Sequence, residues 1–240
     1  MGIIQRQGIR NSIITYTGIG LGAISLLFIQ PHFLTKQEIG LTRILFSFSA
    51  LLASFMQLGT NAVTIKFFPS FRNKEGGHHG FLGLMLILPT VGFLVLGATL
   101  YLLRGTIIAK YTEQSRLFAD YFYYVFPLSF FLTFINVLTA YSYSLFRTSV
   151  PALINEVLVR LVSIVLFTIY FIHWVTLSQF VALFVGIYGL QFLVLVVYIF
   201  IEDSLSLRID WKFVKSLGIG EMLRYAMLLS IGSFSALGLK

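Results

Sequence analysis

Residues 151–174 read PALINEVLVRLVSIVLFTIYFIHW, and residues 161–201 form a run of 41 without Asp, Glu, Lys or Arg. A helix rises 1.5 Å per residue, so crossing the ~30 Å hydrocarbon core of a bilayer takes about 20 residues. The run is too long for one such helix, and its main polar cluster is HWVTLSQ at 173–179. It therefore predicts two membrane-spanning helices joined by a hairpin turn.

The first helix of this hairpin contains two charges. Residues 161–174 number only 14, too few to span, so the helix is expected to begin near Leu153, just after Pro151. Glu156 and Arg160 then lie inside the span, four residues apart, where they can pair. Two interpretations stay open: a neutralised pair that helps the helix insert, or a pair at an aqueous cavity where Arg160 meets an anionic substrate.

The composition agrees with a membrane protein. Of 240 residues, 58% are hydrophobic and 11% are charged, and the mean hydropathy is +0.90. Soluble domains carry about 25% charged residues. Four further uncharged runs are long enough to span, at 13–34, 44–65, 81–103 and 121–146. With the hairpin they predict an all-α polytopic membrane protein with a six-helix bundle.

The net charge of +8 is read as a topology signal, and no nucleic-acid partner is expected. With the N-terminus inside, ten basic residues lie on the inner side and four on the outer side. The inner ones are Arg6, Arg10, Lys66, Arg72, Lys74, Arg147, Arg208, Lys212, Lys215 and Arg224. The outer ones are Lys36, Arg104, Lys110 and Arg116. The positive-inside rule therefore predicts a cytoplasmic N-terminus.

The chain divides into a bundle at 1–201, an amphipathic cytoplasmic linker at 202–220 and a further apolar segment at 221–240. Apolar linker residues share one helical face, as in helices that lie in a membrane interface: Ile209, Phe213, Val214 and Leu217. Residues 225–239 are apolar but number only 15. We expect them to begin a seventh span, and we expect the chain to be a fragment.

No catalytic arrangement stands out. The chain has no cysteine, no phosphate-binding G-x-x-x-x-G-K-[ST] loop and no H-E-x-x-H motif. His78 and His79, in GGHHG, lack carboxylate or thiol neighbours and are a weak metal signal, so a flexible polar loop is expected there. We therefore expect no enzyme activity, no metal and no cofactor.

Polar residues within or beside the spans are the candidates for substrate binding. They are Arg43, Gln57, Asn61, Asn136, Glu156 and Arg160. Arg43 has an alternative role, reaching the outer interface and pairing with Glu38 or Gln37. The three amides have one as well, in hydrogen bonds between helices.

Several segments together resemble a known family. They are NSIITYTGIGLGAISLLFIQPHFLTKQEIGLTRIL at 11–45, QLGTNAVTIKFFPSF at 57–71, PALINEVLVRL at 151–161 and WKFVKSLGIGEMLRYAMLLSIGSF at 211–234. In layout and pattern the chain resembles the polysaccharide biosynthesis and O-antigen flippase branch of the multidrug/oligosaccharidyl-lipid/polysaccharide exporter superfamily.

The resemblance implies a MATE-like transporter of two six-helix bundles, of which this chain holds the first and the start of the second. It implies flipping of an undecaprenyl-diphosphate-linked oligosaccharide across a bacterial cytoplasmic (inner) membrane by alternating access, for polysaccharides such as the O-antigen of lipopolysaccharide. Membrane lipid, a coupling H⁺ or Na⁺ and a polysaccharide polymerase are the implied partners.

Three alternatives stay open. Cation-coupled multidrug exporters of the superfamily often use carboxylates in their helices, notably the first, but residues 13–34 have none. A membrane-embedded glycosyltransferase or polymerase usually has a large extramembrane loop, whereas the longest outer loop here, 104–120, holds 17 residues. A structural scaffold would not need Glu156 and Arg160 within a span.

Overall fold

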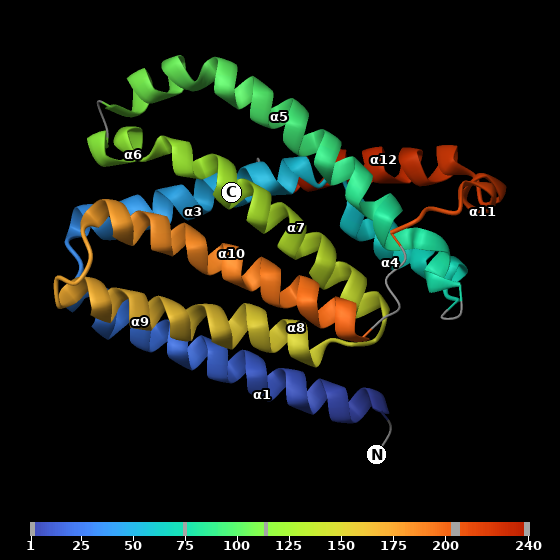
Figure 1. The fold of residues 1–240 in the computed structure, drawn as a ribbon, viewed down its shortest axis with the longest axis horizontal. Coiled ribbons are helices and arrows are strands. Elements are labelled where there is room, and N and C mark those ends of the chain that lie inside the picture. The colour runs from blue at the N-terminus through green and yellow to red at the C-terminus, as the bar shows by residue number, and fades with distance from the viewer. Residues whose placement is uncertain (1–2, 74–75, 113–114, 203–206, 238–240) are drawn as a thin grey trace.

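The computed structural model describes residues 3–73, 76–112, 115–202 and 207–237, with side chains from 7 to 230. These residues form helices and connecting loops, with no strand among them (Figure 1). Six helices within them are long and apolar enough to cross a membrane. They are Gln7–Phe33, Lys36–Met56, Gly77–Thr112, Phe122–Ser144, Ser149–Phe171 and Leu177–Glu202. The chain is therefore a multi-pass membrane protein, and the all-α class with six spans is confirmed.

Two of the spans contain a π-helical turn. The first runs through α1 (Ile3–Ile24), η1 (Ser25–Ile29) and α2 (Gln30–Phe33). The fifth runs through α8 (Ser149–Leu153), η4 (Ile154–Leu158) and α9 (Val159–Phe171). A π-helical turn inserts an extra residue into the helix and is frequent at functional sites.

The predicted hairpin is present. After α9 the chain turns at residues 172–176 and enters α10 (Leu177–Glu202). His173 has a φ of 62° in this turn. The polar cluster in the sequence therefore marked the turn between the fifth and sixth spans.

The second span differs from the expected single helix over 44–65. It is divided into α3 (Lys36–Met56) and α4 (Thr60–Phe71) by a break at 57–59. Leu58 and Gly59 have φ values of 47° and 73°, in the left-handed region that cannot continue a right-handed helix.

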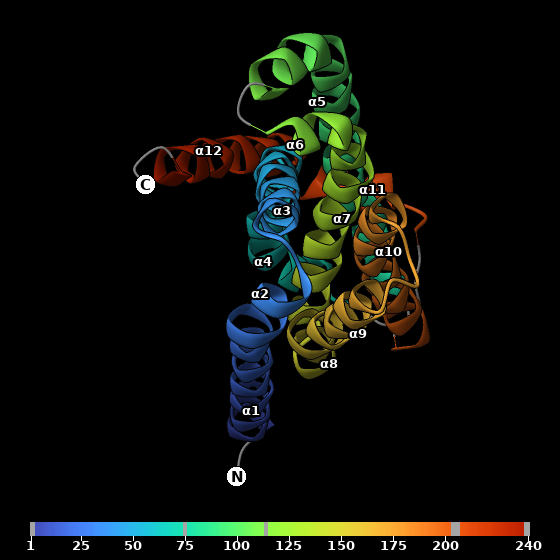
Figure 2. The same cartoon turned by 90° about the vertical axis from the view of Figure 1, so that its left-hand side faces the viewer.

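The central helix of the bundle is α7. The remaining elements are η2 (Gly77–Gly80), α5 (Phe81–Thr112), α6 (Arg116–Asp120), η3 (Phe122–Tyr124), α7 (Val125–Ser144), α11 (Trp211–Ser216) and α12 (Ile219–Leu237). α7 contacts α3, α4, α5 and α10, whereas α1 lies at one side, mainly against the helix formed by α8 and α9 (Figures 1 and 2). On that side of the bundle, the first span therefore packs mainly against one other span, the fifth.

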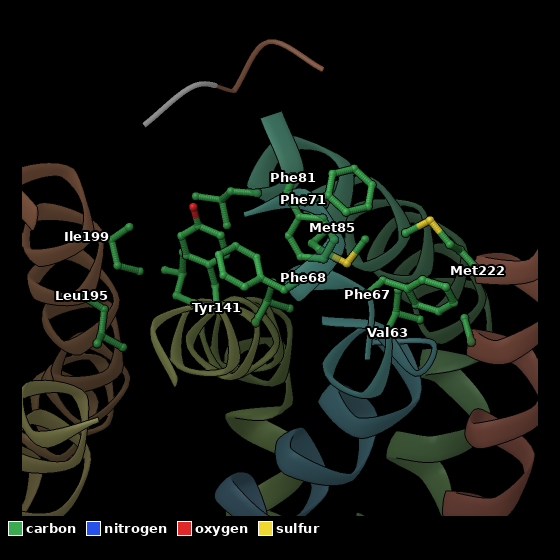
Figure 3. Packing of buried hydrophobic residues seen from close by; sticks show 14 of the residues in the cluster. Val63, Phe67, Phe68, Phe71, Phe81, Met85, Tyr141, Leu195, Ile199 and Met222 are labelled. Atoms are coloured by element: carbon green, nitrogen blue, oxygen red, sulfur yellow. The ribbon is translucent and has the colours of Figure 1, made fainter. Parts of the chain in front are cut away.

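Apolar packing forms two clusters, one toward each end of the bundle. At the end near the N-terminus, aromatic side chains of α4 and α5 meet Tyr141 of α7, with Leu195 and Ile199 of α10 alongside (Figure 3). Phe68, Phe71 and Phe81 are almost completely buried there. Large apolar residues on the outer surface, such as Leu102 at 81% exposed, suit contact with lipid chains.

The GGHHG segment does not form the expected flexible polar loop. His78 is 1% exposed, and the ring of His79 stacks on Phe213 with centroids 3.8 Å apart. Nδ1 of His79 lies 3.2 Å from a carboxylate oxygen of Asp210. Gly80 has a φ of 70°, and an added Cβ would lie 2.8 Å from the Cα of Ile209. His79 holds the linker against the bundle and His78 packs on Phe68, so the prediction of a flexible polar loop was wrong.

Within the part of the linker that the structure describes between α10 and α12, residues 207–218, the helix is α11. Val214 of this helix is fully buried, and Phe213 and Leu217 pack against the cluster near the N-terminus. The apolar face that the sequence suggested for a membrane interface therefore lies against protein in this structure.

After the linker, α12 packs on α4 and then leaves the bundle sideways (Figure 2). Met222, Ala226 and Ser230 are buried at a spacing of four residues. Nζ of Lys66 lies 3.7 Å from the Glu221 carboxylate. An added Cβ at Gly59 would lie 3.0 Å from the Ser230 hydroxyl, so the break in the second span lies directly under α12.

Candidate functional site

A recess of about 520 Å³ opens between the first, fourth, fifth and sixth spans, with Phe46 of α3 at its edge. Its volume is in the range of small-molecule sites, about 300–1,000 Å³. We call it the polar recess and define it by the polar residues in its lining. They are Ser25, Gln30, Asn136, Asn155, Arg160, Ser163, Tyr188 and Gln191. Every one of these side chains comes from a helix long enough to span a membrane.

The charged pair predicted from the i, i+4 spacing is formed. Nη1 of Arg160 donates to a carboxylate oxygen of Glu156 at 2.6 Å and to the Glu156 backbone carbonyl at 2.7 Å. The Arg160 and Glu156 side chains are 32% and 35% exposed. Arg160 borders the recess, but its guanidinium is already held by an anion and a carbonyl. The pair contributes no net charge there.

Glycines of α1 allow this pair to lie against the first span. A Cβ added at Gly18 would lie 2.8 Å from the backbone oxygen of Glu156, and one at Gly22 would lie 3.1 Å from Nε of Arg160. Contacts of that length are closer than carbon normally tolerates. Gly18 and Gly22 of the first span therefore leave the space in which the ion pair of the fifth span packs.

Hydrogen bonds between polar side chains link three helices at the recess. Nδ2 of Asn155 donates to the Thr139 hydroxyl at 3.3 Å, and Nε2 of Gln191 donates to Oδ1 of Asn155 at 2.8 Å. Gln191 is only 5% exposed, and its Oε1 is buried without a hydrogen-bond partner. A buried acceptor left unpaired costs about 1–3 kcal/mol. Gln191 lines the recess, and a rotation of its side chain would present this acceptor to a bound donor.

The structure brings only some of the six candidates together. Asn136 and Arg160 line the recess, and Glu156 holds Arg160. Gln57 is buried at the break in the second span, and Asn61 lies in the first turn of α4 with its Oδ1 buried and unpaired. These two are outside the recess lining.

Arg43 is exposed on α3, and among the described residues it forms no ion pair with Glu38, one of its two alternative partners. Glu38 instead accepts the Tyr170 hydroxyl and the backbone N–H of Thr35, as part of the capping box that starts α3. The Glu38 carboxylate is therefore engaged where the helix begins.

The sequence analysis missed the other polar residues of the recess: Ser25, Gln30, Asn155, Ser163, Tyr188 and Gln191. A signal existed for Gln191, which is the one amide in the middle of an otherwise apolar span. Such residues are commonly found where helices meet. Asn155 directly precedes Glu156, so the sequence placed it inside the fifth span at the same depth as the charged pair.

A wider hollow of about 700 Å³ lies where α2 and α9 end, near His32, Glu38, Tyr170 and Trp174. Both oxygens of the Glu38 carboxylate already accept hydrogen bonds. We therefore regard the polar recess, with its unsatisfied acceptor, as the better candidate for a binding site.

The chemistry of the recess is that of binding. Its groups are amides, hydroxyls and a neutralised guanidinium, which donate and accept hydrogen bonds without supplying an activated nucleophile. Within the described part of the chain no three His, Asp or Glu side chains gather as metal ligands. Comparison of the chain with protein-family models, with curated proteins and with solved structures finds no match.

Proposed function

We propose that the chain forms the first bundle of a flippase that moves an undecaprenyl-diphosphate-linked oligosaccharide across a bacterial cytoplasmic membrane. The polar recess between the membrane-spanning helices carries the proposal. Polar and ionisable groups at membrane depth are costly and usually mark a substrate path. The sugar head needs a polar cavity, while the lipid tail can remain in the bilayer.

In this proposal α12 is the first helix of a second bundle, and the recess opens toward that bundle. The N-terminus lies in the cytoplasm, as the distribution of basic residues predicts. The two π-helical turns and the break at 57–59 are places where the spans can bend as the cavity opens to alternate sides. A coupling H⁺ or Na⁺ drives the cycle, and a polysaccharide polymerase uses the product.

The second candidate, a cation-coupled multidrug exporter, fits the recess less well. Such an exporter requires a carboxylate that can exchange a cation for its substrate. No Asp or Glu lines the recess, and Glu156 nearby is paired with Arg160. A membrane-embedded glycosyltransferase would need an acidic residue as a general base, and the recess lining contains none.

The direct test is translocation in proteoliposomes. The protein would be reconstituted with a fluorescent undecaprenyl-diphosphate disaccharide, and the fraction accessible to an external glycosidase would be followed over time. We expect complete access with protein and half access in empty vesicles. Equal access in both, together with transport of a cationic dye by the protein, would replace the flippase with the drug exporter.

A further inference from the structure

The polar recess has a chemical preference of its own. Building on the proposed function, we propose that it binds the uncharged sugar of the lipid-linked substrate, through hydroxyl and acetamido groups, and that the diphosphate binds elsewhere. Three observations carry this inference: the charge of the recess, its unsatisfied acceptor and the types of polar group in its lining.

The charge of the recess does not suit a phosphate. Arg160 is its only cation, and the Glu156 carboxylate at 2.6 Å already neutralises it. A diphosphate brought between the spans would add negative charge beside Glu156, and the single positive charge of Arg160 cannot balance both groups. Excess negative charge of this kind, held away from water, would upset the neutral pair and is strongly unfavourable. An uncharged ligand can bind without disturbing it.

The unsatisfied acceptor selects a donor. Oε1 of Gln191 has no partner, because the amide hydrogen of this side chain is directed to Asn155. Phosphate diester oxygens only accept hydrogen bonds, so they would place a second acceptor next to Oε1 of Gln191 and leave both without a donor. A sugar hydroxyl or an acetamido N–H donates, and it would remove the cost of leaving Gln191 unpaired.

The remaining lining contains both donors and acceptors. Asn136 is exposed to the recess, and Gln30 and Ser163 lie on the first and fifth spans beside it. Amide and hydroxyl groups of this kind match the paired donor and acceptor character of a sugar hydroxyl. Apolar walls from Leu132, Phe167 and other residues can pack against a sugar ring.

The test compares two lipids that differ only in the sugar. Farnesyl diphosphate and farnesyl-diphospho-N-acetylglucosamine would be titrated by thermophoresis into the purified full-length protein and three variants. Gln191→Leu removes the unpaired acceptor, and Asn136→Ala removes an exposed amide of the recess lining. Gln57→Leu, which removes a buried amide outside the recess, is the matched control.

We expect Gln191→Leu and Asn136→Ala each to weaken binding of the glycosylated lipid about tenfold, as for a lost hydrogen bond, and to leave the bare diphosphate unchanged. Gln57→Leu should change neither. Equal losses for both lipids would assign the recess to the phosphates and overturn the inference, with the proposed function intact. If neither lipid binds the unaltered protein, the inference and the proposed function are both overturned.

Discussion

At the scale of single residues, Gly18 determines how closely the first span can approach the fifth. Gly18→Ala should destabilise the protein by about 1–2 kcal/mol, because the backbone oxygen of Glu156, 2.8 Å from the added Cβ, cannot move as a side chain could. The measurement is the thermal unfolding of the purified protein. Gly20→Ala is the control, since its Cβ would meet nothing within 4 Å and alanine favours a helix by up to about 1 kcal/mol. Equal melting temperatures for the two variants would contradict the close packing.

Asp210 makes the attachment of the linker sensitive to acid. The N–H of Phe213 and the ring of His79 hydrogen-bond its carboxylate and hold its pKa below the ordinary value of 3.8. A carboxylate whose pKa is lowered by folding stabilises the fold at any pH above its ordinary pKa. This stability is lost as the pH falls through the lowered pKa. In a Trp174→Phe background, Trp211 fluorescence should therefore stay constant at neutral pH and change only below pH 3.8.

The control for this titration is Asp210→Asn. Asparagine can still accept the Phe213 N–H but has no charge to lose, so its profile should lack the acid transition. The same transition in both proteins would mean that another group unfastens the linker.

At the scale of elements, the packing of α12 depends on the break between α3 and α4. Gly59→Ala places a side chain at a φ of 73°, against Ser230, and should loosen α12. Because the chain has no cysteine of its own, Met222→Cys can report this directly. Met222 is 5% exposed, so its cysteine should react slowly with a maleimide and faster in the Gly59→Ala background.

The matched substitution is Gly97→Ala in α5, where an added Cβ meets nothing within 4 Å. It should leave the rate of maleimide labelling unchanged. Equal acceleration by both substitutions would show that α12 does not rest on the break.

The elements also show what could be predicted from the sequence. Six spans were predictable, because lipid requires long uncharged helices and charges mark their ends. The break at 57–59 was not, because it lies within an uncharged run and the α12 residues that pack on it come more than 150 residues later. The hydrogen bond between Asn155 and Gln191 could not be predicted either, because the contact between their two helices is set by the fold and not by the local sequence.

At the scale of the whole molecule, the excess of basic residues predicts the orientation in the membrane. Ser70→Cys lies at the end of the bundle near the N-terminus, and Ser178→Cys lies at the opposite end, both exposed. In intact cells an impermeant maleimide should label only Ser178→Cys, and permeabilised cells should label both. Labelling of Ser70→Cys alone in intact cells would reverse the proposed topology.

The position of α1 beside the bundle has a consequence for synthesis. α1 ends at Ile24, and the helix that receives its glycine face begins at Ser149, 125 residues later. At about 5–20 residues per second, the ribosome takes roughly 10 s to make that distance. During this interval the first span must persist in lipid without its partner. Its lack of charged residues between Arg10 and Lys36 allows it to wait there until the ion pair of the fifth span arrives.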